Sequence, residues 1–125
     1  MRYFLSLGSN INAQKNIEFA VSELSKIFSD LESSTIHQTK AEGFEGEDFL
    51  NSVTSGTCQF SFNTLNKKLK EIENVAGRDR NAPKFSARTL DIDIVLQLDE
   101  DDEIIYESEE IIKYKFVSEP LKEIF

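Results

Sequence analysis

The sequence predicts an α+β protein with the ferredoxin-like order β-α-β-β-α-β, in which an antiparallel sheet carries both helices on one face. Two segments show the apolar spacing of an amphipathic helix, and short apolar segments typical of strands flank each of them. The chain has 125 residues, which suits one domain with one core. Residues 1–125 are therefore predicted to form a single domain with short C-terminal additions.

The first strand and the first helix are predicted at the amino-terminal end. Residues 2–7 (RYFLSL) alternate as a strand, and residues 8–10 (GSN) are typical of a turn. From residue 13 to residue 31 the apolar side chains recur every three or four residues. This spacing predicts a helix with one buried face.

Two further strands are predicted before the second helix. The segment 34–39 (STIHQT) is typical of a strand, and so is 49–60 (FLNSVTSGTCQF), in which Gly56 predicts a bulge. Between them, residues 40–48 contain two glycines and no periodicity, which indicates a loop. His37 is expected to be an ordinary strand residue and not a catalyst.

The second helix and the last strands complete the pattern. Ser61 or Asn63 is expected to begin a helix whose apolar stripe includes Leu65 and Leu69, and Gly77 is expected to end it. The predicted elements that follow are a strand over 89–96, a short strand over 103–108, and a terminal helix over 118–125 that begins with Ser118 and Pro120.

The strand in the segment RTLDIDIVL (88–96) contains Asp91 and Asp93 among aliphatic residues. Side chains alternate along a strand, so both carboxylates would lie on one face, with Cα atoms roughly 6.5–7 Å apart. Two carboxylates held this close repel each other unless a cation lies between them, and ligation by oxygen alone suits Mg²⁺. The alternative is an acidic, solvent-exposed strand face.

Composition excludes several other functions. The formal net charge of −9 argues against nucleic acid or an anionic membrane as a partner. Cys58 is the only cysteine, and the chain begins without a signal-peptide pattern, so we expect a cytoplasmic protein.

Residues 78–88 form a basic segment that would suit phosphate, although a solvated loop is the alternative. No P-loop and no protein-kinase motif set occurs.

Four motifs in order, LGSN (7–10), FLNSV (49–53), EIENVAGRDR (71–80) and RTLDIDIVL (88–96), resemble the 6-hydroxymethyl-7,8-dihydropterin pyrophosphokinase family of folate biosynthesis. The resemblance extends from residue 1 to about residue 97 and agrees with the predicted order of elements. It implies an ATP-dependent enzyme that transfers pyrophosphate to the hydroxymethyl group of a reduced pterin and releases AMP. It also implies two Mg²⁺ ions, small-molecule substrates and a monomer.

The resemblance also implies roles for individual residues of this chain. Asp91 and Asp93 would bind the two metal ions and act in catalysis together with Arg78 and Arg88. The residues expected at the pterin are Asn51, which would read its polar edge, Phe49 and Phe116, which would form its aromatic walls, and Thr39 and Phe85. The residues expected at ATP are Lys70, Glu73, Arg80, Arg88, Lys113 and Lys115.

The C-terminal segment departs from the family pattern. The family's proline–histidine element and the arginine after it are missing, and EEIIKYKFVSEP (109–120) offers only Lys113 and Lys115 as positive charges. Two alternatives therefore stay open. One is a catalytically degenerate protein of the same fold that binds pterin or nucleotide, and the other is an unrelated ferredoxin-like regulatory or interaction domain.

Overall fold

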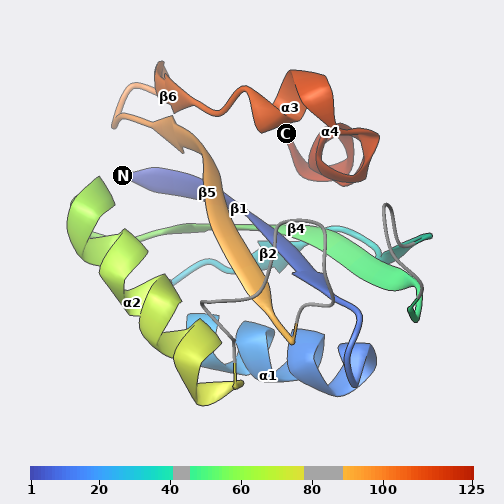
Figure 1. The fold of residues 1–125 in the computed structure, drawn as a ribbon. Helices are drawn as coiled ribbons and strands as arrows, with labels where there is room; N and C mark the ends of the chain where they lie inside the picture. The colour runs from blue at the N-terminus through green and yellow to red at the C-terminus, as the bar shows by residue number, and fades with distance from the viewer. Residues whose placement is uncertain (41–45, 78–88) are drawn as a thin grey trace.

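The computed structural model describes residues 1–40, 46–77 and 89–125. Its centre is one antiparallel sheet in the order β2-β4-β1-β5-β6, with β3 also paired to β4 (Figure 1). The strands are β1 (Arg2–Ser9), β2 (Glu32–Ser33), β3 (His37–Thr39), β4 (Phe49–Thr57), β5 (Asp91–Leu98) and β6 (Ile104–Glu107). The helices are α1 (Ala13–Leu24), α2 (Phe62–Val75), α3 (Glu110–Lys113) and α4 (Lys115–Ile124).

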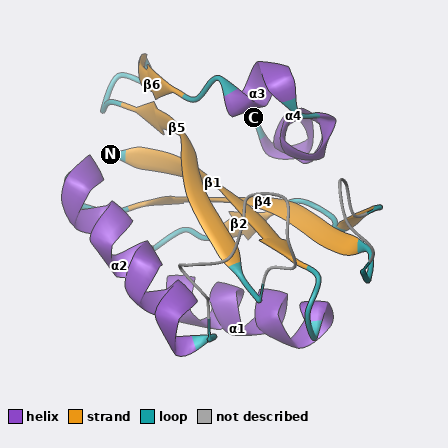
Figure 2. Cartoon of the chain, in the orientation of Figure 1, coloured by secondary structure: helices purple, strands orange, loops and turns teal. Residues whose placement is uncertain are grey.

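Helices cover both faces of the sheet. Figure 2 shows α1 and α2 on one face and the C-terminal pair α3 and α4 on the other. The main core between the sheet and the first two helices includes Tyr3, Leu5, Leu7, Ile17, Leu24, Leu65, Leu69 and Ile92. A second cluster under α4 includes Phe4, Val53, Val95, Leu96, Leu98, Val117 and Leu121. The predicted ferredoxin-like fold is confirmed, and the C-terminal additions supply a third layer.

The segment predicted as a turn at 8–10 is partly strand, because β1 continues to Ser9. Ser9 is buried, and its hydroxyl donates a hydrogen bond to the carbonyl of Thr89, just before β5. The side-chain amide of Asn10 donates to the carbonyl of Glu47 at 3.1 Å, just before β4. This end of β1 therefore holds the starts of both neighbouring strands.

Helix α1 ends at Leu24, well before the predicted end at residue 31. The N–H of Lys26 donates to the carbonyl of Glu23 at 3.2 Å, and that of Ile27 donates to Leu24 at 3.0 Å. Bonds over three residues tighten the backbone into a turn, which ends the helix. The turn brings Phe28 into the core.

Gly56 does not form the predicted bulge. The register between β1 and β4 is unbroken, and Gly56 lies opposite Tyr3. A Cβ atom at this position would lie 2.6 Å from Cβ and Cγ of Phe28, well inside van der Waals contact. Glycine is needed here because the ring of Phe28 packs directly on the backbone of β4.

We expect the substitution Gly56→Ala to lower the free energy of unfolding by about 1–3 kcal/mol, because the new methyl group overpacks the contact with Phe28. Chemical denaturation would measure the change. The double variant Gly56→Ala/Phe28→Gly should lose less than the sum of its two single variants, since glycine at position 28 removes both atoms of the contact. Full additivity, or a neutral Gly56→Ala, would contradict this account of the contact.

Of the strand predicted over 34–39, only His37–Thr39 forms a strand, β3, while the separate β2 at Glu32–Ser33 lies before the predicted range. The N–H of Ser34 donates to the carbonyl of Val53 at 2.8 Å, but the N–H of Val53 donates to the hydroxyl of Ser34 at 2.9 Å. A side chain thus replaces the backbone acceptor, and the ladder is interrupted. Strand β4 also ends earlier than predicted, at Thr57.

Helix α2 has the predicted ends. The hydroxyl of Ser61 accepts a hydrogen bond from the N–H of Thr64 at 3.3 Å, so Ser61 is the N-cap. After the helix, Gly77 has a φ of 93°, a left-handed conformation that favours glycine. The predicted apolar stripe is confirmed, with Leu65 and Leu69 fully buried.

The C-terminal segment differs from its prediction. Strand β6 lies within the predicted range 103–108, but α4 begins at Lys115 and not at Ser118. Pro120 lies inside this helix and is buried with Leu121 against the second core cluster. Packing on the sheet thus sustains a helix that the proline alone would interrupt. In the described part of the chain, no helix combines the length and the apolar character needed to cross a membrane.

Candidate active site

Strand β5 shows the predicted alternation. Ile92 and Ile94 are buried in the main core beneath the sheet, whereas Asp91 and Asp93 are only half-buried. In the ladder, Asp91 lies opposite Gly8 and Asp93 lies opposite Ser6. The two carboxylates therefore extend from the face opposite to α1 and α2.

A bulge at Val95 separates a polar end of β5 from an apolar end on the same sheet face. Leu96 lies opposite Phe4, but Ile94 lies opposite Leu5, so Val95 is an extra residue in β5. Val95 and Leu96 both join the cluster under α4. One end of this sheet face therefore carries carboxylates, and the other end is apolar core.

Gly8 connects the carboxylates with the polar end of β4. It lies opposite Asp91 on one side and opposite Asn51 on the other, so these three positions form a row across one face. A Cβ atom on Gly8 would lie 3.2 Å from Oδ1 of Asn51. Glycine in this position leaves room for the Asn51 side chain between the strands.

The predicted pterin residues of β3 and β4 lie together at one end of this face. Asn51 is 4% exposed, and its amide donates to the hydroxyl of Thr39 at 2.9 Å. Thr39 lies opposite the half-buried Phe49 in the ladder. The amide is thus fixed in orientation beside an aromatic side chain.

Two residues of α2 reach the end of β5 that does not pair with β6. Glu73 is fully buried, and its carboxylate accepts the N–H of Ile92 at 2.7 Å. The ammonium of Lys70 lies 3.2 Å from the carbonyl of Ile92, 3.1 Å from the carboxylate of Glu73 and 3.3 Å from Oδ1 of Asp93. Because β6 pairs only with the far end of β5, these side chains can hydrogen-bond the backbone of Ile92 at the near end.

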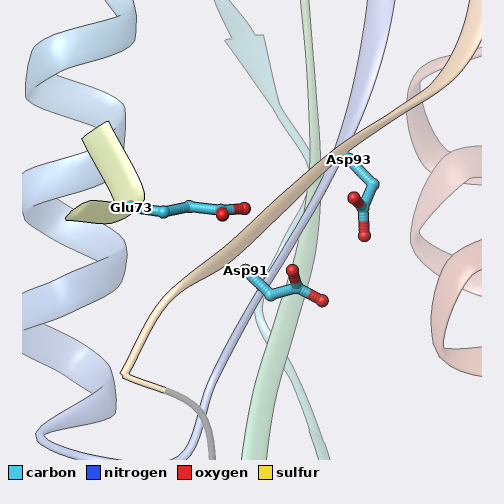
Figure 3. A group of neighbouring side chains, drawn as sticks. All are labelled: Glu73, Asp91 and Asp93. Carbon is cyan, nitrogen blue, oxygen red and sulfur yellow. The ribbon is translucent and has the colours of Figure 1, made fainter. Parts of the chain in front are cut away.

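Glu73, Asp91 and Asp93 form a carboxylate cluster. One oxygen from each lies within 4.8 Å of the others, and Figure 3 shows Glu73 approaching β5 from the side opposite to the two aspartates. Burial, followed by the charge of Asp91, raises the pKa of Asp93 to about 6, while the ammonium of Lys70 opposes this increase. Close oxygen ligands with excess negative charge fit a hard divalent cation such as Mg²⁺.

The C-terminal candidates lie on α3 and α4. Phe116 is half-buried on α4, and its ring stacks on that of Tyr114 with 4.8 Å between centroids. Lys113 and Lys115 are both exposed, and Lys113 pairs with Glu109 at 3.3 Å. A cleft of about 630 Å³ lies at this end, lined by Tyr106, Glu107, Ser108, Glu109, Glu110, Lys113 and Tyr114.

Four predicted site residues, Arg78, Arg80, Phe85 and Arg88, lie outside the described residues. His37 lies in β3, as predicted, but its ring contacts the carboxylate of Glu123 on α4. Sequence reasoning missed Glu123, because nothing in the pattern of the terminal helix distinguishes it from a solvated charge.

Comparison with known proteins agrees with this arrangement. The family model described as 7,8-dihydro-6-hydroxymethylpterin-pyrophosphokinase (HPPK) matches residues 4–125. The chain is 42% identical over 105 residues to a folate synthesis bifunctional protein of Chlamydia caviae, and 38% identical over 104 residues to that of Chlamydia muridarum. Each alignment covers 77% of this chain and 23% of the relative.

A third relative is the 2-amino-4-hydroxy-6-hydroxymethyldihydropteridine pyrophosphokinase of Aquifex aeolicus, with 34% identity over 99 residues. That alignment covers 78% of this chain and 61% of the relative, so the chain spans less than two thirds of the length of each of these three proteins. The family match extends over both the aspartate strand and the C-terminal helix. The chain belongs to the 7,8-dihydro-6-hydroxymethylpterin-pyrophosphokinase family.

Proposed function

We propose that this chain transfers pyrophosphate from ATP to the hydroxymethyl group of 6-hydroxymethyl-7,8-dihydropterin, releasing AMP, as a step of folate biosynthesis. Family membership supports the reaction class. The observation that carries the proposal is the row of Asn51, Gly8 and Asp91 across one sheet face. This row places the Asn51 amide, which can hydrogen-bond a heterocycle, close to the Asp91 carboxylate. Carboxylates at this position can bind a metal ion together with a polyphosphate.

At the pterin end, Asn51 would pair with the polar edge of the ring. The hydrogen bond to Thr39 restricts the rotation of the amide, so its donor and acceptor are already oriented for the ligand. Phe49 and Phe116 would supply the aromatic walls of the slot, since flat heterocycles bind well between aromatic faces. Phe85 is proposed to contact the same ligand.

At the phosphate end, Asp91 and Asp93 would hold two Mg²⁺ ions together with ATP. When bound, the metal would supply positive charge to neutralise phosphate oxygens and make the substrate hydroxyl more acidic. Lys70 and Glu73 would line the nucleotide site next to these aspartates, since Lys70 already contacts Asp93. Arg78, Arg80 and Arg88 are proposed to bind phosphate oxygens, with Arg78 and Arg88 acting in catalysis.

In this proposal the pterin end and the phosphate end of the site hold the two substrates in position for one reaction. The pterin hydroxymethyl oxygen attacks the β-phosphorus of ATP, the bond from this phosphorus to the α-phosphate oxygen breaks, and AMP leaves. The hydroxyl proton is released as the new bond forms. The chain contributes mainly orientation and charge, which are the main needs of phosphoryl transfer.

The decisive experiment is incubation with ATP, Mg²⁺ and reduced hydroxymethylpterin, followed by chromatography for AMP and the pterin diphosphate. We expect the two products in equal amounts, and no AMP when the pterin is omitted. Binding of both substrates without AMP would overturn the enzymatic proposal. It would instead support the alternative, a pterin- or nucleotide-binding protein of the same fold.

Lys113 and Lys115 are proposed to replace part of the missing C-terminal charge at ATP. Replacing both by alanine should weaken ATP binding about tenfold, the value of one charge-assisted contact, and should leave pterin binding unchanged. Calorimetric titration of each ligand would measure the two effects. A matched control, Lys15→Ala/Lys26→Ala, removes the same charge from exposed positions on and just after α1. Equal losses in both double variants would show a general charge effect.

We further propose that the chain acts as a single domain and as a monomer in the cytoplasm. Cys58, its only cysteine, is buried and has no second cysteine for an internal disulfide, which suits a reducing compartment. Each face of the sheet is packed against helices of the same chain, which supports the monomer. Sedimentation of the purified protein would measure its mass in solution.

A further inference from the structure

Glu123, near the end of α4, accepts hydrogen bonds from a segment far away in sequence. The N–H of Thr35 donates to Oε1 at 2.8 Å, and the hydroxyl of Thr35 lies 2.9 Å from both carboxylate oxygens. Nε2 of His37 also contacts Oε2. We call Glu123, Thr35 and His37 the Glu123 latch.

The latch joins Glu123 to the N–H and the hydroxyl of Thr35 as well as to the ring of His37. The side chains of His37 and Glu123 are 27% and 32% exposed, so neither is fully solvated. Thr35 lies in the gap between β2 and β3, where its N–H has no strand partner, and the carboxylate supplies the acceptor. The amide of Thr35 and the ring of His37 hold the pKa of Glu123 below its usual range.

Glu123 lies at a position in α4 that is unfavourable for a carboxylate. A carboxylate in the last turn of a helix faces the negative end of the helix dipole, which is unfavourable. Three donors from the β2–β3 region offset this effect. The hydrogen bonds from Thr35 and His37 therefore stabilise the Glu123 carboxylate at this position.

The latch joins the two sides of the proposed pterin slot. On one side, His37 lies opposite Asn51 in the ladder, and β3 also carries Thr39, which orients the Asn51 amide. On the other side, α4 carries Phe116. Helix α4 packs on β4 and β3. The latch therefore fixes Phe116, one proposed wall, relative to Asn51 on β4, which would hydrogen-bond the pterin ring.

We propose that the Glu123 latch positions α4 against β3 and thereby sets the affinity for the pterin, without taking part in the transfer of pyrophosphate. Glu123 and His37 are positioning residues in this inference, which rests on the proposed function. The phosphate end of the site belongs to β5 and α2, so it should be insensitive to the latch.

The test compares Glu123→Ala, Glu123→Gln and a control in pterin titrations followed by fluorescence. Glu123→Ala should raise the Kd for reduced hydroxymethylpterin about tenfold, since a hydrogen bond to a charged group contributes on this order and the ligand would then have to order the wall itself. Glu123→Gln keeps an acceptor for Thr35 and should lose less. The KM for ATP and kcat should stay unchanged. Glu23→Ala, which breaks the ion pair of Glu23 with Lys26 at α1, should change none of these values.

Amide exchange of Thr35 by NMR gives a readout independent of turnover. Its N–H should be protected in the unaltered protein and lose protection in Glu123→Ala. Lost protection with an unchanged pterin Kd would overturn the positioning role, and so would an equal loss in kcat or in ATP affinity. If the unaltered protein bound no pterin at all, the proposed function would fail instead, which keeps the two failures distinct.

Discussion

Replacing either Asp91 or Asp93 by alanine is expected to lower kcat by a hundredfold to a thousandfold or more, on the order of the loss of one preorganised electrostatic group. The two side chains share one sheet face and lie in a three-carboxylate cluster with Glu73. No other described carboxylates combine this proximity with a position next to Asn51. Steady-state measurement of AMP release would give the loss.

The fold should survive both substitutions. Asp91 and Asp93 are half-buried and belong to neither apolar cluster, so circular dichroism should be unaltered. Asp101→Ala removes an exposed carboxylate from the β5–β6 turn and serves as the matched control, with full activity expected. A fully active Asp91→Ala or Asp93→Ala that still requires magnesium would remove the metal assignment.

The fold was predictable because the periods of the chain are clear. Apolar residues three and four apart mark α1 and α2, and the alternation of β5 sets the two aspartates on one face. Ser61 and Gly77 follow ordinary helix-end chemistry, so both ends of α2 were also predictable. These are local signals, and local reasoning is sufficient for them.

The errors arose where distant contacts decide the local structure. Gly56 was predicted as a bulge, but its role depends on Phe28, which lies on another element. The proline of α4 suggested a late helix start, whereas packing on the sheet keeps Pro120 inside the helix. The true bulge at Val95 has no sequence signal, because valine is an ordinary strand residue.

The candidate site was also predictable only where local signals decide it. The strand alternation identified the two aspartates as candidates and the resemblance identified Asn51, but neither indicated that Lys70 and Glu73 hydrogen-bond the backbone of β5. That arrangement depends on β6 being too short to cover the near end of the strand. The predicted roles of Lys70 and Glu73 at ATP stay predictions, but their contacts with β5 give these residues a second, structural purpose.

Binding of Mg²⁺ is expected to weaken about tenfold for each pH unit below 6, because a proton then competes with the cation at Asp93. Burial and the neighbouring charge of Asp91 raise the pKa of Asp93 to about 6. Between pH 6 and pH 4 the loss should reach about fiftyfold, since about half of Asp93 is already protonated at pH 6. Calorimetry with Mg²⁺ alone, without ATP or pterin, measures this affinity directly.

The raised pKa of Asp93 also makes the folding stability depend on pH. A carboxyl group whose folded pKa lies above its unfolded value of 3.8 binds a proton more tightly in the folded state. Its contribution to stability is therefore present below about pH 4 and is lost as the pH rises through about 6. Bound Mg²⁺ should restore stability above pH 6, where the carboxylate is ionised.

Three measurements separate this account from general acid destabilisation. Calorimetry near pH 5 in buffers of different ionisation enthalpy should show close to one proton released per cation bound. Asp93→Asn should bind Mg²⁺ weakly and with little dependence on pH between 5 and 7. Asp101→Ala should keep the full dependence of the unaltered protein. A Mg²⁺ affinity that stays constant from pH 7 to pH 4 would contradict a role for Asp93 as a ligand with this raised pKa, and the cation site would then have to rest on Asp91 and Glu73.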